Sequence, residues 1–177
     1  FAEAEFLPHN EEWLEAGISP RWAWEKMGEN GFLGANQPEE YGGAGGDFLY
    51  DAIIMEELAD LRLHALQASL HTNICMPYLT TFASEEQKQR WLVPAIEGKC
   101  LLAIAMTEPS TGSDLANVST KAIRDGDEYV LNGSKTFISC GQNADLVIVV
   151  AKTDPDISPP HDGMSLILVE AGTPGFE

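Results

Sequence analysis

The residues best suited to chemistry stand where two apolar runs end in polar side chains. The first segment is AMTEPSTGSD at residues 105–114, and the second is KTFISCG at residues 135–141. Thr107 and Ser139 each carry a hydroxyl, which can donate to or accept from the nitrogen or carbonyl edge of a planar heterocycle. Phe137 stands two residues before Ser139 and offers a ring face or edge to the same ligand. Together these residue types fit a planar ring with polar edges.

The loop of the first segment adds groups that suit a phosphate or a sugar-alcohol chain. Gly112 and Ser113 supply backbone N–H groups and a hydroxyl, and a glycine lets a ligand come close to the backbone. Pro109 fixes the backbone of the turn and removes an N–H that would need a partner. A flavin nucleotide would use all of these groups. Ordinary surface loops have the same composition, so the residues alone leave a flavin site and a plain loop as alternatives.

Metal and thiol chemistry are not indicated by the remaining reactive side chains. The cysteines are widely spaced without a C-x-x-C pair and stand in or beside apolar runs, which favours buried thiols in a reducing compartment. Two histidines seven residues apart could share a helix face, but without a third ligand we interpret them as packing or surface groups. We therefore expect no metal. The residues concerned are Cys75, Cys100, Cys140, His64 and His71.

The charge of the chain narrows the classes of partner. Its 177 residues include ten basic and 28 acidic side chains, a net charge of −18. Nucleic acid and anionic membrane surfaces are poor partners, because both are bound by basic side chains. No run reaches the roughly 18 apolar residues of a membrane-spanning helix, so we expect no membrane insertion. No signal segment opens the chain, but position 1 falls inside a predicted helix, which leaves open whether a leader precedes it.

The hydrophobic pattern divides the chain near residue 98. Residues 1–98 have helical spacing and carry 17 acidic against five basic side chains, which predicts a helical bundle with an acidic surface. Within it, Ser19-Pro20, Asp47 and the capping box Ser84-Gln87 predict helix starts. Gly31 predicts a helix end, and Pro77 predicts a bend or break.

Residues 99–177 change to a period of two and predict six short strands. With no helices between them, these strands favour an antiparallel sandwich or barrel. Asn132-Gly133 predicts a tight hairpin turn, because both residues tolerate positive φ. The strands are expected at 100–106, 118–124, 127–132, 134–139, 145–153 and 164–170.

Four motifs resemble the acyl-CoA dehydrogenases. AMTEPSTGSD, followed about thirty residues later by LNGSKTFIS, resembles the paired signature of that family. PEEYGGAGG at 38–46 and SEEQKQRWLVPAIEGK at 84–99 match its amino-terminal helical domain in the same order. The motif details, including Phe137 where tryptophan is more usual, look closest to the long-chain acyl-CoA dehydrogenases. The resemblance implies an α+β multidomain fold, with a helical amino-terminal domain over 1–98 and a middle β-domain over 99–177.

The resemblance also implies a set of cofactor-binding residues. Ile104, Ala105, Met106, Thr107, Gly112 and Ser113 would line FAD, with Thr107 bonded to its ring. Phe137, Ile138 and Ser139 would cover the ring and its N5 edge, and Ser113 would also contact the polar part of an acyl-CoA substrate. Phenylalanine at 137 lacks the indole N–H, which puts in doubt any contact that the family makes through that nitrogen.

The implied reaction is α,β-dehydrogenation of fatty acyl-CoA to trans-2-enoyl-CoA. A carboxylate removes an α-proton, the β-hydride passes to flavin N5, and the electrons go on to electron-transfer flavoprotein. The family's third, carboxy-terminal helical domain normally supplies that base and the tetramer interface, and we expect it outside these residues. Glu108 is expected to be structural and not the base. The protein would be a homo-oligomer (tetramer or dimer), cytoplasmic if bacterial and in the mitochondrial matrix if eukaryotic.

Two other functions remain open from the sequence. An acyl-CoA oxidase on the same scaffold would pass electrons to dioxygen. A non-catalytic two-domain binding or scaffold protein would follow if the natural chain ended at residue 177.

Overall fold

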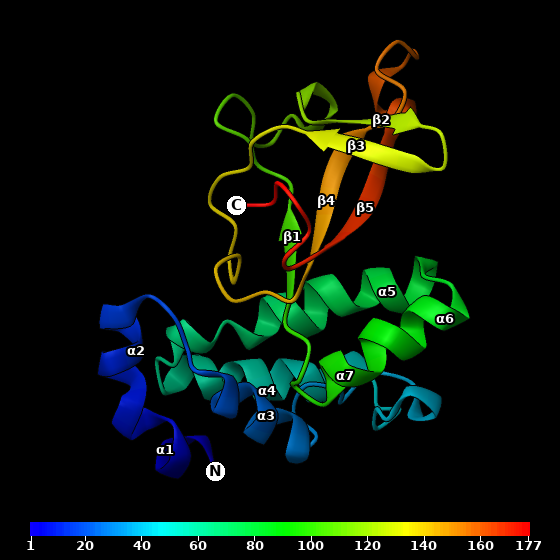
Figure 1. Cartoon of the computed structure of the whole chain (residues 1–177). Helices are drawn as coiled ribbons and strands as arrows, with labels where there is room; N and C mark the ends of the chain where they lie inside the picture. The colour runs from blue at the N-terminus through cyan, green and yellow to red at the C-terminus, as the bar shows by residue number, and fades with distance from the viewer. The chain divides into compact units, whose positions relative to one another are not determined.

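The computed structural model describes all of residues 1–177 and contains two compact units (Figure 1). One unit comprises Phe1–Leu102 and Gln142–Asp145, and the other comprises Ala103–Gly141 and Leu146–Glu177. The first is helical and the second holds the β-sheet. The α+β class expected from the sequence is thereby confirmed.

The helical unit is built from short helices. The α-helices are α1 (Ala2–Glu5), α2 (Asn10–Ala16), α3 (Arg21–Glu29), α4 (Phe48–Asp60), α5 (Met76–Phe82), α6 (Glu85–Gln87) and α7 (Val93–Ile96). The 3₁₀ turns are η1 (Leu7–His9), η2 (Glu39–Tyr41) and η3 (His64–Leu66), and the π-helical turns are η4 (Leu70–Cys75) and η5 (Lys88–Leu92). No helix is both long enough and apolar enough to cross a membrane.

Local capping chemistry explains where several of these helices begin. Asp47 accepts a hydrogen bond from the backbone N–H of Leu49 and caps α4, and Ser84 with Gln87 forms a capping box at α6. Both caps were expected from the sequence. The predicted cap at Ser19 is wrong: α3 begins one residue later with Pro20 at the N-cap position, and the Ser19 hydroxyl accepts from the Trp24 indole instead.

Each π-helical turn runs directly into an α-helix that has a proline as its second residue. Pro77 lies in the first turn of α5 after η4, and Pro94 lies in the first turn of α7 after η5. Because each π-helical turn continues directly into its α-helix, the proline removes an N–H inside a continuous helix, and the change from π-helical to α-helical bonding falls at that proline. The helix around Pro77 therefore changes its hydrogen-bonding pattern where the sequence predicts a bend or break.

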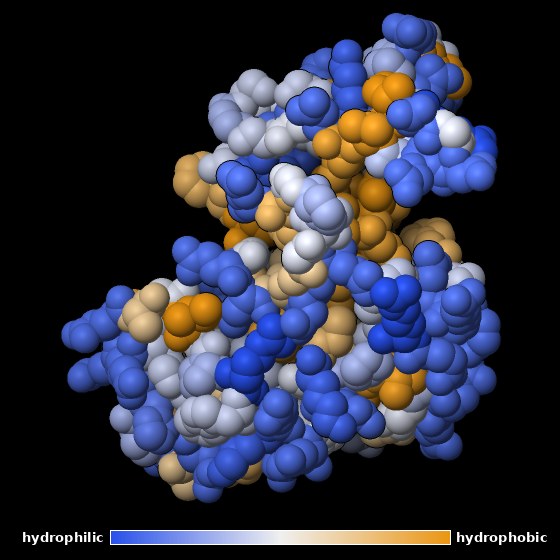
Figure 2. All heavy atoms as spheres, viewed as in Figure 1, coloured by the Kyte–Doolittle hydropathy of each residue, from blue (hydrophilic) through white to orange (hydrophobic).

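The core of the helical unit includes a neutral histidine. His71 is fully buried against Trp24, its Nδ1 accepts from the Leu102 N–H, and its Nε2 donates to the Ala95 carbonyl. Burial lowers the pKa of His71 to about 4, so the ring is uncharged at neutral pH. This confirms His71 as a packing group. On the visible face of this unit hydrophilic residues predominate, in keeping with its acidic composition (Figure 2).

Segment 142–145 is held in the helical unit by one ion pair. The Arg21 guanidinium bonds both carboxylate oxygens of Asp145, and it also donates to the Asn143 carbonyl at 3.0 Å. Asp145 Oδ2 in turn accepts from the Leu101 N–H at 2.7 Å. A bidentate contact of this kind fixes orientation as well as distance.

The second unit holds a five-stranded mixed sheet of β1 (Leu102–Ala105), β2 (Lys121–Asp125), β3 (Glu128–Asn132), β4 (Leu146–Lys152) and β5 (Met164–Glu170). The strand order is β1-β4-β2-β3, and β5 pairs with β4. β2–β3 and β4–β5 are antiparallel, whereas β2 meets β4 in parallel through a single register pair, Lys121↔Lys152. In Figure 1 the β2–β3 hairpin crosses the β4–β5 pair at a steep angle, which explains why their pairing is so short. The sheet is therefore not purely antiparallel.

Two sequence predictions in this unit are wrong. The hairpin turn lies at Gly126, between the paired residues Asp125 and Glu128, and not at Asn132-Gly133. Gly126 has φ +63°, the left-handed region that a tight turn requires. Residues 134–139, expected as a strand, form no strand because they leave the sheet after β3.

Candidate cofactor site

The first candidate segment passes from a buried strand into a closed turn. Ile104 and Ala105 are buried in β1, and Met106 and Thr107 are partly exposed. Two backbone hydrogen bonds between Glu108 and Thr111, at 2.9 and 3.1 Å, then close a tight turn around Pro109. The predicted sequence of strand, turn and loop is therefore correct at this position.

Glu108 is the centre of a buried polar network. Its carboxylate accepts from the backbone N–H and the hydroxyl of both Ser119 and Thr120, at 2.5–2.9 Å. The Lys135 ammonium adds a fifth bond at 2.9 Å. A carboxylate can be buried this completely only when its lone pairs are satisfied in this way.

The electrostatics of Glu108 exclude it as a general base at neutral pH. Burial acts to raise its pKa, but the hydrogen bonds from Ser119 and Thr120 outweigh burial and hold the pKa well below the usual range for glutamate. A carboxylate that stays ionised and fully bonded has neither the affinity nor the free lone pair to accept a substrate proton. Its role in this structure is to hold the backbone.

Lys135 connects the two candidate segments. Besides Glu108, its Nζ donates to the Met106 carbonyl at 3.0 Å, and the next residue, Thr136, donates its backbone N–H to the Thr107 carbonyl at 3.0 Å. The end of β1 and the start of the second segment therefore lie side by side. This much of the predicted site is brought together by the chain itself.

The second segment continues into an exposed ring and a turn. Phe137 is 91% exposed and has φ +57°, a conformation that is uncommon for a bulky residue. A turn closed by the Gly141 N–H and the Ile138 carbonyl follows, and it leaves Ile138 and Ser139 partly buried. Burial raises the pKa of the adjacent Cys140 to about 11, so this thiol stays protonated at neutral pH.

Gly112 and Ser113 lie in the exposed part of the first loop. A Cβ placed on Gly112 would meet no atom within 4 Å, and its φ lies outside the left-handed region. Neither the packing of the chain nor its backbone conformation therefore requires glycine at 112. Ser113 lies in the same unit as Phe137 and Ser139, but no hydrogen bond joins it to either residue.

Sequence reasoning missed three residues of the network: Ser119, Thr120 and Lys135. Thr120 lies outside the two candidate segments, yet it is 2% exposed and bonded to Glu108. Gly133 also belongs here, since a Cβ on it would lie 2.2 Å from the Thr120 hydroxyl. Residue 133 is a glycine because its backbone passes close to the Thr120 side chain, and not because it forms a hairpin turn. Only Lys135, inside the quoted LNGSK motif, carried a sequence signal.

Known proteins match this chain along its whole length. Residues 1–99 match the acyl-CoA dehydrogenase N-terminal domain, and residues 103–177 match the acyl-CoA dehydrogenase middle domain. The mitochondrial long-chain specific acyl-CoA dehydrogenase of Sus scrofa is 47% identical over 176 residues, which are 99% of this chain and 41% of that protein.

Solved structures give the same result. An acyl-CoA dehydrogenase from Geobacillus kaustophilus is 51% identical, with a TM-score of 0.95 over 99% of this chain and 46% of that chain. A glutaryl-CoA dehydrogenase from Mycobacterium smegmatis in complex with FADH2 is 32% identical, with a TM-score of 0.89 over 100% of this chain and 44% of that chain. The chain thus spans less than half the length of these relatives. On both domain matches, it belongs to the acyl-CoA dehydrogenase family.

Proposed function

We propose that the whole protein catalyses FAD-dependent α,β-dehydrogenation of fatty acyl-CoA thioesters to trans-2-enoyl-CoA. Acyl-CoA dehydrogenases are FAD-dependent, and the M. smegmatis relative is described in complex with FADH2. The 47% identity to a long-chain specific enzyme favours a long acyl chain. Two segments of the sheet unit, residues 104–113 and 137–139, form the proposed flavin-binding surface.

The observation that carries this proposal is the conformation of Phe137. A phenyl ring that is 91% exposed at positive φ gains nothing from packing within its unit. Backbone strain of this kind persists where the surrounding structure enforces it and often accompanies a binding site. Here the neighbouring Lys135 and Thr136 are fixed by hydrogen bonds to Met106 and Thr107. An exposed ring on so fixed a segment suits the face of an isoalloxazine.

The other residues have separate proposed roles. The hydroxyls of Thr107 and Ser139 bond the polar edge of the ring, and Ile104, Ala105, Met106 and Ile138 contribute its apolar surroundings. Gly112 leaves room for the ribityl-pyrophosphate chain, since a side chain there would project into open space. Ser113 contacts the polar part of the acyl-CoA as well as the cofactor.

FAD, when bound, supplies the acceptor for the substrate hydride. The chain's own residues orient the ring and exclude water from one face of it. The charged, fully bonded Glu108 holds the backbone of residues 104–113 in place. Because Glu108 cannot accept the α-proton, we assign that step to a carboxylate in the part of the protein that these residues do not include. The relatives' greater length leaves room for such a residue.

The partners and location follow from the same proposal. Electron-transfer flavoprotein accepts the electrons, the protein acts as a homo-oligomer, and a bacterial source would place it in the cytoplasm. An acyl-CoA oxidase is the alternative, because oxygen access depends on the shape of the completed pocket. The scaffold function is disfavoured by the family match over both domains.

Anaerobic reduction of the purified native protein tests the proposal. A long-chain acyl-CoA should bleach the visible absorption of bound flavin, and the product should be the trans-2-enoyl-CoA. Slow reoxidation in air and fast reoxidation by electron-transfer flavoprotein would support a dehydrogenase, and the reverse would support an oxidase. Absence of flavin, or flavin that no acyl-CoA bleaches, would overturn the proposed function.

A further inference from the structure

The sequence contains the pair Asn-Gly twice, at Asn30-Gly31 and at Asn132-Gly133. An asparagine followed by glycine is prone to spontaneous deamidation, because a glycine without Cβ lets its backbone nitrogen reach the side-chain amide carbon of the asparagine. Both asparagines are exposed, so water reaches each of them. The two pairs differ in their hydrogen bonds.

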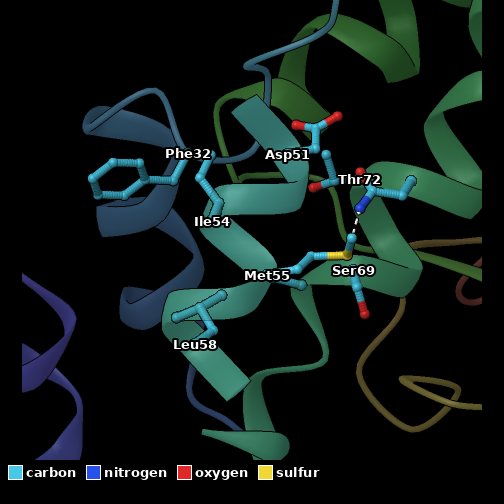
Figure 3. Close-up of a pocket in the computed structure, with 9 residues that line it drawn as sticks. Phe32, Asp51, Ile54, Met55, Leu58, Ser69 and Thr72 are labelled. Atoms are coloured by element: carbon cyan, nitrogen blue, oxygen red, sulfur yellow. Dashed lines mark hydrogen bonds between the residues drawn. The ribbon is translucent and has the colours of Figure 1, made fainter. Parts of the chain in front are cut away.

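At Asn30-Gly31 both reacting groups are bonded. The side-chain amide nitrogen of Asn30 donates to the Lys26 carbonyl at 2.8 Å. The backbone N–H of Gly31 donates to the Gly28 carbonyl at 2.9 Å. The next residue, Phe32, lines the small, largely apolar cavity beside α4, which holds the chain after the glycine (Figure 3). The Gly31 nitrogen must therefore give up a hydrogen bond before it can attack.

At Asn132-Gly133 neither reacting group is bonded. Asn132 is the last residue of β3, and its side chain forms no hydrogen bond. Gly133 follows the strand, and its backbone N–H has no acceptor. The attacking nitrogen and the amide carbon are thus neighbours in the chain, accessible to water and free of competing hydrogen bonds.

We propose that Asn132 is a site of spontaneous deamidation and that Asn30 is protected from it. The Gly133 nitrogen forms a bond to the side-chain amide carbon of Asn132, ammonia leaves, and a cyclic imide (succinimide) remains. Water then opens the imide at either of its two carbonyl groups. One product is aspartate, with an unchanged backbone. The other is isoaspartate, whose backbone is longer by one methylene and which carries the same negative charge.

The longer backbone of isoaspartate falls where the sheet unit has no room for it. Gly133 passes so close to Thr120 that a Cβ on the glycine would lie 2.2 Å from the threonine hydroxyl oxygen. Two residues later, Lys135 bonds the Glu108 carboxylate and the Met106 carbonyl. An additional methylene before Gly133 must displace this glycine from Thr120 or displace Lys135 from its partners. Isoaspartate should therefore loosen the network around Glu108.

Ageing of the purified native protein at mildly alkaline pH tests the first step. Peptide mapping by mass spectrometry follows deamidation at both positions, and electron-based fragmentation distinguishes isoaspartate from aspartate. In the folded protein Asn132 should convert about tenfold faster than Asn30, because reaction at Asn30-Gly31 requires the loss of two hydrogen bonds. In urea-unfolded protein the two rates should approach each other. No conversion at Asn132, or equal rates at both positions in the folded protein, would overturn the proposal.

Thermal unfolding of the aged protein tests the effect on the network. Tm should fall in proportion to the isoaspartate fraction, and bound flavin should be lost in parallel. The loss of flavin rests on the proposed function, whereas the conversion rates and Tm do not. A failure of the proposed function is therefore distinguishable from a failure of this inference.

Two variants assign the loss of stability to the longer backbone. Asn132→Gln, aged in the same way, should retain its Tm, because the longer side chain forms a cyclic imide far more slowly. Freshly purified Asn132→Asp should match the native protein, because its charge lies opposite Lys121 in the β2–β3 register, where opposite charges stabilise a sheet. An unchanged Tm in fully converted protein, or an equal loss of stability in Asn132→Asp, would overturn the effect on the network.

Discussion

Glu108 and Lys135, 27 residues apart in the sequence, form an ion pair at 2.9 Å with side chains only 1% and 11% exposed. The same ammonium reaches the Met106 carbonyl, so one side chain holds the end of β1 and the start of the second candidate segment together. The surface that we propose for the flavin therefore depends on a pair that does not itself face the ligand.

The first prediction concerns this pair. Lys135→Met should lower the free energy of unfolding by about 3 kcal/mol, because it leaves the Glu108 carboxylate buried without its cation. The folded fraction should also hold flavin more weakly, since the two segments lose their connection. Chemical unfolding and the flavin-to-protein ratio of the same sample measure the two effects.

Lys121→Met is the matched control, because Lys121 is an exposed lysine on β2 of the same unit. It should leave both quantities near those of the native protein. If Lys135→Met were no more damaging than this control, the ion pair would not organise the site.

The second prediction separates binding from folding at two glycines. Gly112→Val should change stability by less than about 0.5 kcal/mol, because its side chain meets nothing within 4 Å. It should nevertheless reduce FAD retention, since the side chain would occupy the ligand's space. Gly126→Val should do the opposite, costing about 1–3 kcal/mol for its positive φ while the folded protein keeps its flavin.

Melting temperature and flavin occupancy on both variants test this contrast. Full flavin occupancy in Gly112→Val would show that residues 112–113 form a plain loop.

The third prediction compares three hydroxyl residues. Ser139→Ala and Thr107→Val should weaken FAD retention modestly, by about 0.5–1.5 kcal/mol each, with little loss of stability. Thr120→Val should mainly destabilise the fold, by about 1–3 kcal/mol, because it removes a donor from the buried Glu108 carboxylate. Flavin binding titrations together with unfolding curves distinguish these effects. Wild-type flavin affinity and redox potential in both Ser139→Ala and Thr107→Val would refute the assigned ring contacts.

Local chemistry made part of this structure predictable from the sequence. The Asp47 cap and the box at Ser84-Gln87 involve residues within three positions of each other, and β5 has the predicted bounds because its pattern is local. The failures involve distant residues. The sequence Asn132-Gly133 is typical of a hairpin turn, but in the structure Gly133 packs against Thr120, the residue just before β2.

The candidate site shows the same limit. Thr107 lies just beyond a strand, as predicted, but Phe137 lies in a segment that forms no strand. No spacing rule indicates that Ser119 and Thr120 supply four of the five donors to Glu108. The domain division at residue 98 remains a prediction for the whole protein.

The fourth prediction concerns acid unfolding. The pKa of His71 is 6.5 in a model peptide and is lowered by burial to about 4 in the fold. Between these values the unfolded chain binds the proton and the folded chain does not, so stability falls as pH drops from about 6.5 to 4 and this contribution is constant below. The loss totals about 3 kcal/mol. Glu108, whose pKa is lowered, adds a further loss only below about pH 4.5.

His71→Gln should flatten the loss of stability between pH 6.5 and 4, whereas His161→Gln, at an exposed position, should retain it. Urea unfolding at a series of pH values measures the slopes. An unchanged slope in His71→Gln would contradict a neutral, buried His71.

A crystal structure of the native protein with FAD bound tests the central claim most directly. The account predicts that the isoalloxazine ring lies against Phe137, with its polar edge within about 3.2 Å of the Thr107 and Ser139 hydroxyls and its phosphate chain beside Gly112. FAD bound elsewhere, with Phe137 still in solvent and both hydroxyls out of hydrogen-bond reach, would contradict it.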